Sequence, residues 1–348
     1  MNVIKLLLLP FAALYNMVMR LRNHLYDIGY KPSFQFDIPV ITVGNLNAGG
    51  SGKTPMIEYL IVLLKEKFSL ATLSRGFGRD TQGYRAARES ETARSMGDEP
   101  FQLFRKFGNE INVVVGEDRV LAIPTILQEF SETEVILLDD ALQHRSVKAQ
   151  LTILVTEYSN PFYRDFVIPS GRLRESRWGA SRADLIVVTK CNEQLSLEEK
   201  KGITRDIEKY AGQKPVFFSG IQYQTPLAMG IQSAWSDNLV LVSGIAKAQS
   251  ILSLCSSKYK VLKHFNFPDH HRYSAADLQR IENFCKGISG PFSIVTTEKD
   301  MVKLIGPELS VFLDRQPWFY IPIRHTFLQD GTQFDDLVLN AVANTRKH

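Results

Sequence analysis

Short apolar runs recur along the first two thirds of the chain, and loops or segments of helical spacing separate them. The run at 38–43 (IPVITV) is β-branched and predicts a strand buried on both faces. Residues 55–67 (PMIEYLIVLLKEK) follow it with the apolar spacing of a helix. Further strands are predicted at 69–73, 111–115, 135–138, 151–155 and 185–189. This alternation is typical of an α/β fold with a doubly wound, mostly parallel sheet.

A second, smaller α/β unit is predicted after an extended connector at 213–226. Ser274 and Asp277 form a capping box for a helix at 275–286. We expect a last strand at about 318–323 to pair with the connector and to return the C-terminal helix to the first unit. Strands of the second unit are predicted at 239–242, 260–265 and 292–296.

The length of 348 residues favours two domains over one. We predict a nucleotide-binding domain over 31–215, a smaller domain over 216–324, and a return of about 325–348 to the first domain. The net charge of +4 is too mild to indicate a nucleic-acid partner, and no feature of the sequence indicates an obligate protein partner. The three cysteines are few and far apart, which is typical of buried side chains in a reducing compartment.

The N-terminal 30 residues form a separate helical part. Residues 3–19 are mostly apolar, and the basic residues Arg20 and Arg22 follow. The run contains Lys5 and Pro10 and is shorter than the ~20 apolar residues that a membrane-spanning helix needs. The pattern favours a helix that lies in the membrane interface, with a helix packed on the protein's own core as the alternative.

A phosphate-binding loop is predicted directly after the strand at 38–43. The residues Asn47, Ala48, Gly49, Gly50, Ser51, Gly52, Lys53 and Thr54 follow the Walker A pattern, with Asn47 in the position of the first glycine. Asn tolerates a left-handed backbone better than most residues do. Backbone N–H groups at a helix N-terminus bind phosphates, Lys53 would contact the β- and γ-phosphates, and Thr54 would bind Mg²⁺. A glycine-rich turn that binds nothing is the alternative.

The strand at 135–138 ends in two acids, Asp139 and Asp140, as in a Walker B element. Carboxylates at the carboxyl end of a strand beside a P-loop would face the metal ion, directly or through water. Two solvated loop carboxylates are the alternative. The order of strand, loop, helix and acidic strand therefore predicts nucleotide binding, whereas the fate of the γ-phosphate stays open.

Two segments of the sequence are partly similar to those of other classes of P-loop protein. Residues 187–192 (VVTKCN) are similar to the element with which GTPases read guanine, but Asn192 stands where the guanine-binding aspartate is needed. The loop is also similar to that of partitioning and metal-chaperone ATPases, whose signature lysine would fall at Ala48. Each match lacks its defining residue.

Eight segments together resemble the lipid A 4′-kinase (tetraacyldisaccharide 4′-kinase) family, in the family's order and across most of the chain. They are 43–45 with the G-G-S-G-K-T-P loop, 74–79 (SRGFGR), 97–100 (GDEP), 139–144 (DDALQH), 169–175 (PSGRLRE), 184–190 (DLIVVTK), 267–271 (FPDHH) and 296–300 (TTEKD). Departures from the family pattern are small: Ala141 stands where glycine is commoner, and Ser170 where alanine is frequent.

The resemblance implies transfer of the ATP γ-phosphate to the 4′-hydroxyl of a glucosamine disaccharide that carries four acyl chains and a 1-phosphate, with Mg²⁺ as the metal. It implies that Asp98 is the base that receives the hydroxyl proton and that His270 orients it. Glu99 would join Thr54, Asp139 and Asp140 around the metal. The residues alone leave another possibility, in which Asp98 or Glu99 caps a helix that begins at Pro100.

Softer assignments concern the acceptor and the membrane. Candidates for contact with the acceptor or the nucleotide are Arg75, Arg79, His144, Arg172, Arg174 and Glu175, and surface salt bridging is the alternative for the arginines. The 296–300 segment is a candidate for contact with the nucleotide base. An acylated acceptor stays in a bilayer, so we expect the terminal helix to dock the enzyme on the cytoplasmic face of the bacterial inner membrane. The competing functions are a P-loop ATPase or GTPase switch or chaperone, and a nucleotide-sensing scaffold.

Overall fold

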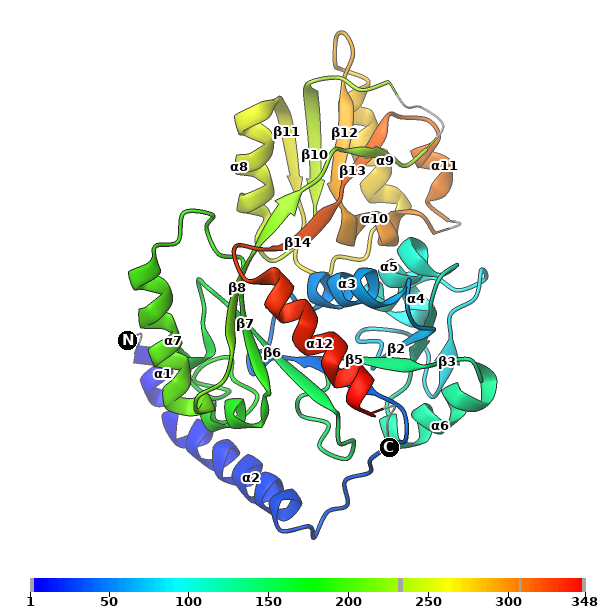
Figure 1. The fold of residues 1–348 in the computed structure, drawn as a ribbon. Helices are drawn as coiled ribbons and strands as arrows, with labels where there is room; N and C mark the ends of the chain where they lie inside the picture. The colour runs from blue at the N-terminus through cyan, green and yellow to red at the C-terminus, as the bar shows by residue number, and fades with distance from the viewer. Residues whose placement is uncertain (1–2, 231–233, 307, 346–348) are drawn as a thin grey trace.

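The computed structural model describes residues 3–230, 234–306 and 308–345. It contains a nine-stranded sheet and a five-stranded sheet, each flanked by helices, with the smaller unit at the top of Figure 1. The predicted parts 1–30, 216–324 and 325–348 include residues 1–2, 231–233, 307 and 346–348, which lie outside the described residues.

The large sheet is mostly parallel, as the alternation predicted. Its central strands are β1 (Val40–Gly44), β5 (Val135–Asp139), β2 (Leu70–Ser74), β6 (Leu151–Glu157) and β7 (Leu185–Thr189). The order is β14-β8-β7-β6-β1-β5-β2-β4-β3, with β4 (Asn112–Val115) and β8 (Val216–Tyr223) also parallel. The edge strands β3 (Arg85–Ala86) and β14 (Ile323–Phe327) are antiparallel to their neighbours.

Helices cover both faces of this sheet because alternate strand residues point to opposite sides. Leu137 and Val187 face a core shared with α3 (Lys53–Leu64), α5 (Asp98–Phe107) and α12 (Gly331–Thr345). Their neighbours Ile136 and Ile186 face the other side, which α6 (Arg119–Glu129) and α7 (Leu197–Ala211) cover. The short helices α4 (Ala93–Met96), η1 (Phe162–Arg164) and η2 (Arg177–Arg182) lie in connections.

The small sheet has the order β11-β10-β12-β13-β9. Its strands are β9 (Leu227–Ala228), β10 (Asn238–Ser243), β11 (Lys260–Asn266), β12 (Ser293–Thr297) and β13 (Trp318–Ile321). Its helices are α8 (Ala248–Lys258), α9 (Ala275–Cys285), α10 (Glu298–Leu304) and α11 (Ser310–Leu313). The predicted capping box of α9 is present, with Ser274 and Asp277 bonded reciprocally.

The segment predicted as one last strand is two strands that belong to different sheets. β13 ends at Ile321 in the small sheet, and β14 begins at Ile323 and pairs with β8 in the large sheet. Pro322 lies between them, and a proline has no N–H with which to continue a ladder. The predicted connector, β8, is therefore a strand of the large sheet, and two strands, β8 and β14, run between the units (Figure 1).

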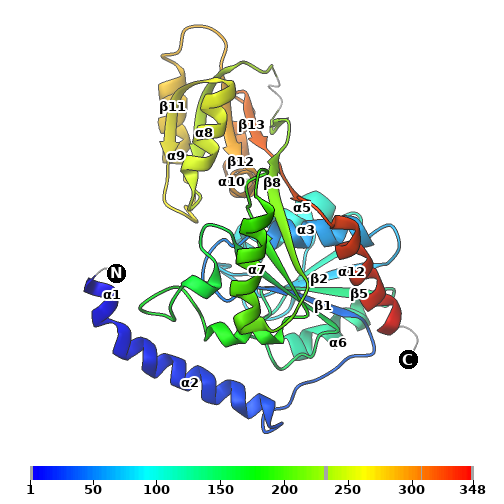
Figure 2. The ribbon, with the colours of Figure 1, turned by 60° about the vertical axis from the view of Figure 1, so that its left-hand side comes forward.

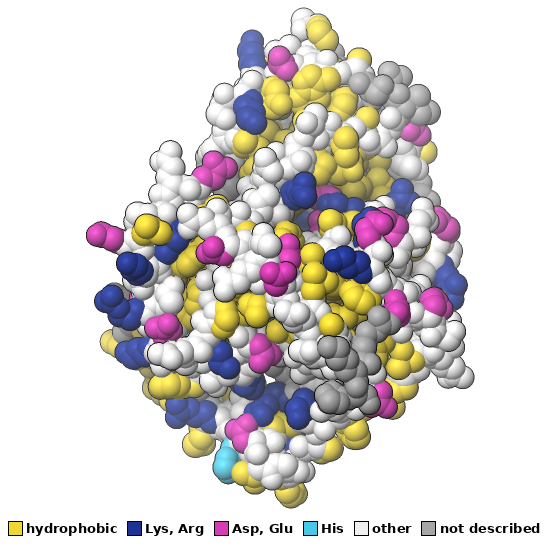
Figure 3. All heavy atoms as spheres, in the orientation of Figure 1, with side chains coloured by type: hydrophobic (Ala, Val, Ile, Leu, Met, Phe, Trp, Pro, Cys, Tyr) yellow, Lys and Arg dark blue, Asp and Glu magenta, His cyan; other side chains and the backbone are white. Residues whose placement is uncertain are grey.

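The N-terminal helices α1 (Val3–Leu7) and α2 (Leu9–Asp27) lie along the outside of the large unit (Figure 2). Ala12 is the buried residue of α2, so the alternative of a helix packed into the core is not what the structure shows. Its exposed apolar side chains are Phe11, Leu14, Met17, Val18 and Leu21. In the part of the chain that is described, no helix combines the length and apolar character needed to cross a bilayer. On the face of the molecule that Figure 3 shows, basic and acidic side chains are interspersed.

Candidate active site

The phosphate-binding loop joins the carboxyl end of β1 to the first residue of α3, as predicted. Gly49 and Gly52 have φ values of 117° and 88°, in the left-handed region that glycine tolerates. A Cβ on Gly52 would also lie 3.2 Å from Thr189 Oγ1. No side chain caps the N-terminus of α3, so its first N–H groups remain for an anionic ligand.

Asn47 does not occupy the left-handed backbone region that motivated its place in the pattern. Instead its side-chain amide donates to Asp165 Oδ2 at 3.1 Å, and its backbone forms a bridge with Leu173. The N–H of Ala48 donates to the carbonyl of Arg172 at 2.6 Å. The two positions that depart from the commonest P-loops therefore anchor the loop to the 165–174 segment.

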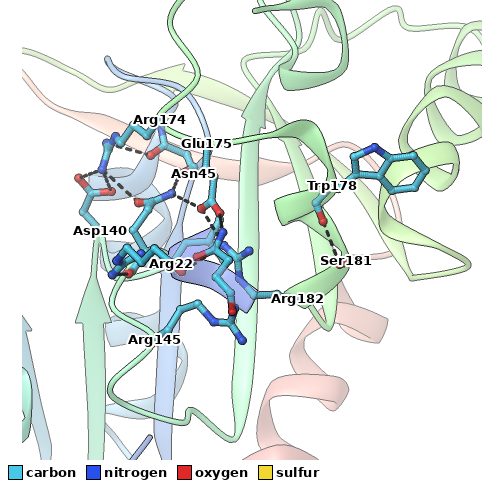
Figure 4. A network of polar contacts seen from close by, with 12 residues as sticks. Arg22, Asn45, Asp140, Arg145, Arg174, Glu175, Trp178, Ser181 and Arg182 are labelled. Carbon is cyan, nitrogen blue, oxygen red and sulfur yellow. Dashed lines mark hydrogen bonds and ion pairs between the residues drawn. The ribbon is translucent and has the colours of Figure 1, made fainter. Parts of the chain in front are cut away.

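Asn45 is fully buried at the base of the loop and connects it to two cations. Its amide donates to the carbonyl of Asn47 at 2.7 Å. Its Oδ1 accepts from Lys53 Nζ at 3.3 Å and from Arg174 Nη2 at 3.2 Å. Figure 4 shows Asn45, Arg174 and Asp140 in one network. In the sequence, Asn45 is only one residue of the 43–45 motif segment. Its burial and its contacts in the structure reveal its structural role.

The segment that resembles a guanine-reading element holds the other side of the loop. The Thr189 hydroxyl donates to the carbonyl of Ser51 at 2.6 Å, and Lys190 Nζ donates to the carbonyl of Gly50 at 2.5 Å. Lys190 has a φ of 56°, a conformation that costs a non-glycine residue free energy. The 187–192 segment thus stabilises the backbone of the phosphate-binding loop.

The two acids at the end of β5 have different environments. Burial, together with the carboxylate of Glu99, raises the pKa of Asp139 to about 7. Burial disfavours charge on Asp140 as well, but Lys53 and Arg174 outweigh it and hold the pKa of that carboxyl below its usual value. Lys53 Nζ lies 3.7 Å from Asp140 Oδ1, and Arg174 Nη1 lies 2.9 Å from the same carboxylate. The alternative of two solvated loop carboxylates does not describe Asp139, which is 2% exposed.

These acids fit a cation. Asp139 Oδ1 is buried without a hydrogen-bond partner among the described residues, and a cation would offset the repulsion between Asp139 and Glu99. Within the described residues no three His, Cys, Asp or Glu side chains form a metal cluster by themselves. Mg²⁺ is usually held by one or two carboxylates together with phosphate oxygens and water, so such a cluster is not required.

Helix α5 begins with the two acids of the 97–100 segment. Gly97, with a φ of 95°, occupies the N-cap position, and a Cβ there would lie 3.0 Å from the carbonyl of Phe77. Asp98 and Glu99 lie in the first turn, and no side chain caps the helix. The possibility that one of these acids caps a helix beginning at Pro100 is therefore wrong, and both carboxylates remain for other partners.

Asp98 meets His270 across the space between the two units. His270 Nδ1 lies 3.5 Å from Asp98 Oδ2. His270 has a φ of 57°, and its other ring nitrogen lies 3.3 Å from Lys299 Nζ. The ring of Phe77 contacts the imidazole edge-on, with the centroids 5.9 Å apart. The structure thus brings together two residues that are far apart in the sequence, and adds Lys299 of the 296–300 segment to them.

Of the residues predicted to contact the phosphate acceptor, some are held in ion pairs within the protein and others are accessible. Arg79 is paired with Glu117, and Arg172 with Asp165. Arg75 is exposed. Burial, together with Arg119 and Arg75, lowers the pKa of His144 to about 4 and so keeps the imidazole neutral. Arg174, as described, lies against Asp140.

Glu175 is 1% exposed and connects the terminal helix to the site (Figure 4). Its carboxylate accepts from Asn23 at 2.8 Å, from Gln143 at 3.0 Å and from Arg182 at 2.7 Å. The hydroxyl of Tyr15 donates to the carbonyl of Arg174. The α2 helix therefore contacts the same segment that anchors the phosphate-binding loop.

Arg119 is a further candidate that the sequence did not indicate. It is 1% exposed and donates to the carbonyl of Gly116 at 2.8 Å, while Nε and Nη2 have no partner among the described residues. Burial, together with the charge of Arg75, lowers its pKa to about 10. Nothing in its local sequence distinguishes it from an ordinary arginine in the first turn of a helix.

Comparison with known proteins gives a consistent result. Residues 4–343 match the family model described as tetraacyldisaccharide-1-P 4′-kinase. The chain is 42% identical to the tetraacyldisaccharide 4′-kinase of Flavobacterium johnsoniae, with 98% of each chain covered. It is 38% identical to the protein of that name from Bacteroides thetaiotaomicron, with 97% of this chain and 94% of the relative covered.

A solved structure is similar over nearly the whole chain. It is the "apo" form of LpxK from Aquifex aeolicus in complex with ATP. The two proteins are 27% identical, with a TM-score of 0.75 and coverage of 97% of this chain and 99% of the other. The similarity therefore extends over both sheets and the terminal helix.

We predict that Asp139→Asn weakens Mg²⁺ binding in the presence of a non-hydrolysable ATP analogue. The expected loss is at least the ~10-fold that is common even for partners outside the metal's own ligands. Calorimetric titration with Mg²⁺ measures it, and the exposed Asp206→Asn variant is the control. Unchanged Mg²⁺ affinity in Asp139→Asn would remove this residue from the metal site.

Proposed function

The chain belongs to the tetraacyldisaccharide-1-P 4′-kinase family, and we propose on that premise that it transfers the γ-phosphate of ATP to the 4′-hydroxyl of a tetraacylated glucosamine disaccharide 1-phosphate in lipid A biosynthesis. The observation that carries this function is the contact between Asp98 on α5 and His270 on the second unit, beside Glu99, whose carboxylate interacts with Asp139 at the end of β5. A base on the nucleotide-binding unit, with its partner on the second unit, suits a reaction with an external hydroxyl acceptor that enters between the units.

The residues of the loop bind and orient the nucleotide. The loop N–H groups that are not bonded within the protein and the N-terminus of α3 would hold the phosphates, and Lys53 would reach the transferred group by leaving Asp140. Thr54, Asp139, Asp140 and Glu99 would hold Mg²⁺, which would supply neutralisation of the phosphate charge. Lys53 and the buried Arg119 would exclude water and replace its hydrogen bonds to the phosphates.

Asp98 receives the hydroxyl proton in this proposal. Lys299 Nζ can only donate, so Nε2 of His270 accepts in this contact, and a ring proton would lie on Nδ1, the nitrogen 3.5 Å from Asp98 Oδ2. Contact with Nδ1 would orient the carboxylate toward the acceptor. His270 is therefore a positioning partner of the base, and Lys299 sets its tautomer.

We further propose an acceptor site at the mouth of this region. Arg75 is exposed beside Arg119 and the neutral His144, and the unpartnered Nε and Nη2 groups of Arg119 would donate to phosphate oxygens. Arg174 remains a candidate at the Asp140 side of the site. Arg79 and Arg172 are held by carboxylates and would have to leave them to bind an anion, and Glu175 would act through its hydrogen bonds.

Membrane docking is proposed for the terminal helix over 1–30. Leu14, Met17 and Leu21 are each more than half exposed, and ordinary surfaces seldom carry so many neighbouring apolar side chains. Arg20 flanks them, whereas Arg22 points inward and donates to the carbonyl of Gln143. ATP places the site on the cytoplasmic side, so we propose a peripheral enzyme on the cytoplasmic face of the inner membrane. We also propose one domain over 31–215 with 325–348 and a second over 216–324, joined by β8 and β14, which pair within the large sheet.

Incubation with γ-labelled ATP and the acylated disaccharide 1-phosphate tests the function. We expect the label on the 4′-oxygen of the disaccharide and slow hydrolysis without the acceptor. A P-loop switch or chaperone would instead release free phosphate, faster with a protein partner. Label that appears only as free phosphate would overturn the proposal.

We predict that Asp98→Ala lowers kcat by about 10²- to 10⁴-fold, the range for loss of a general base, with little change in ATP binding. Lys53→Ala should weaken ATP binding and lower kcat together, because this residue contacts the phosphates. Steady-state kinetics and nucleotide titration separate the two effects. Lost ATP affinity with intact turnover in Asp98→Ala would assign Asp98 to structure.

We predict that the triple variant Leu14→Asn, Met17→Asn and Leu21→Asn binds phospholipid vesicles at least about tenfold more weakly. Each apolar side chain that enters the interface contributes up to about 1.5–3 kcal/mol. Sedimentation with liposomes measures binding, and Val62→Asn, on an exposed apolar position of α3, is the matched control. Equal sedimentation of both variants would exclude this face as the anchor.

A further inference from the structure

The C-terminal end of α5 contacts two other helices through one lysine. Lys106 Nζ lies 2.7 Å from Glu58 Oε2 on α3 and 2.9 Å from Glu298 Oε1 on α10. Gln102, one turn earlier on α5, donates to the other oxygen of Glu58 at 2.8 Å. We call Glu58, Gln102, Lys106 and Glu298 the Lys106 cluster. It joins the helix that follows the phosphate-binding loop, the helix that begins with Asp98, and the first residue of a helix in the second unit.

The Lys106 cluster buries more negative than positive charge. Glu58 and Glu298 are 6% and 5% exposed and share one ammonium group. Burial raises the pKa of Glu58 to about 7; Lys106 opposes this rise, and the carboxylate of Glu298 adds to it. The two carboxylates in turn raise the pKa of Lys106 although burial acts against its charge. Tyr320 interacts with Glu298, Lys106 and Glu58 of this cluster, and Arg105 interacts with Tyr320.

An arrangement of this kind is a poor source of stability. Buried ion pairs often contribute less than apolar side chains of the same size would, because desolvation offsets the attraction between the charges. Removing one partner is nevertheless costly, since it leaves a buried charge unpaired. Such a cluster is suited to fixing one geometry among several, and the elements that it joins indicate which geometry that is.

Helix α5 is attached to the second unit at both ends. Asp98 at its first turn meets His270, and Lys106 at its last turn meets Glu298, about 12 Å away along a helix that rises ~1.5 Å per residue. Between these points Lys299 Nζ lies 4.0 Å from Glu99 Oε1. Figure 1 shows α5 and α10 side by side at the junction of the units.

Glu298 also reaches the strand that returns to the large sheet. Its Oε2 accepts from the N–H of Ile323, the first residue of β14. Because Pro322 before it separates the two sheets, Ile323 is the point at which the chain passes from one unit to the other. Lys106 is thus linked through Glu298 to Ile323, at the point where the chain crosses from the second unit to the large sheet.

We propose that Lys106 is a positioning residue for phosphoryl transfer, which holds α5 between α3 and α10 so that Asp98 faces both the phosphate-binding loop and His270. This inference rests on the proposed kinase function and deepens it. Without Lys106, α5 loses its direct link to Glu298, and α10 can move away from α3 together with the unit that carries His270 and Lys299. A shift of ~1 Å at a reacting group is enough to lower a rate about 10²-fold.

Kinetics of four variants test the proposal. Lys106→Met removes the charge at similar length, and Lys106→Arg keeps it. Lys106→Met with Glu298→Gln also removes one of the two carboxylates left without Lys106. Lys65→Met is the control, since Lys65, the C-cap of α3, pairs with Glu110 and that pair does not reach the second unit. We expect Lys106→Met to lower kcat about tenfold or more with a nearly constant KM for ATP, and Lys106→Arg to recover most of it. Lys65→Met should retain the wild-type kcat.

The double variant separates positioning from charge compensation. If Lys106 positions α5, adding Glu298→Gln restores the melting temperature but leaves kcat low, because the link to α10 is still missing. Recovery of kcat together with the melting temperature would overturn the proposal, as would a Lys106→Met variant with the wild-type kcat.

A measurement without turnover distinguishes this inference from the proposed function. The imidazole NMR signals of His270, assigned with a His270→Gln variant, report on its contact with Asp98. We expect them to shift in Lys106→Met and to stay in place in Lys65→Met. Unshifted signals would overturn the positioning role even in an active kinase. If the wild type does not phosphorylate the disaccharide, the proposed function fails, while the NMR comparison still decides whether Lys106 sets the position of His270.

Discussion

Val43 of β1 lies opposite Asp139 of β5 in a parallel ladder, and this register determines where the charges of the site lie. Because both strands run in the same direction, the phosphate-binding loop and the acidic pair leave the sheet at the same edge. Lys53 then falls within reach of Asp140, and α3 directs its free N–H groups toward that edge. A shift of one residue would exchange the two faces of β5 and bury its aliphatic residues on the wrong side, so the core itself maintains the register.

The second unit contributes the remaining side chains of the site, which the edge of the large sheet does not supply. The nucleotide side of the site is built from β1, β5 and α3. His270 and Lys299 belong to the second unit, whose residues lie between β8 and β14 in the sequence. Lys247, before α8, adds another link by pairing with Glu157 at the end of β6. The orientation of the units therefore also sets the position of the proposed base, Asp98, relative to His270, which suits an enzyme that must exclude water around a phosphoryl group.

Much of this arrangement was predictable because it depends on local signals. β-branched runs, the glycine loop and the capping box of α9 each specify their own conformation, and the structure contains all three. The motif segments also identified Asp98 and His270, whose proximity the structure shows. The metal and acceptor assignments stay predictions.

The parts that were missed depend on packing between distant segments. Lys106 and Arg119 occupy ordinary helical positions, and their importance follows from the elements that surround them. The 187–192 segment resembles a guanine-reading element in the sequence, whereas Lys190 within it holds the backbone of Gly50. The split at Pro322 is a local signal that was available in the sequence, since a proline seldom continues a central strand.

Asp140, Lys190 and His270 share one backbone property, the left-handed conformation, with φ values between 52° and 57°. In the described chain the other non-glycine residue of this kind is Asp330, which lies before α12. Each such residue costs about 1–2 kcal/mol relative to a right-handed backbone. Selection for thermal stability alone would therefore favour glycine at these three positions, and would weaken the catalytic site as it strengthened the fold.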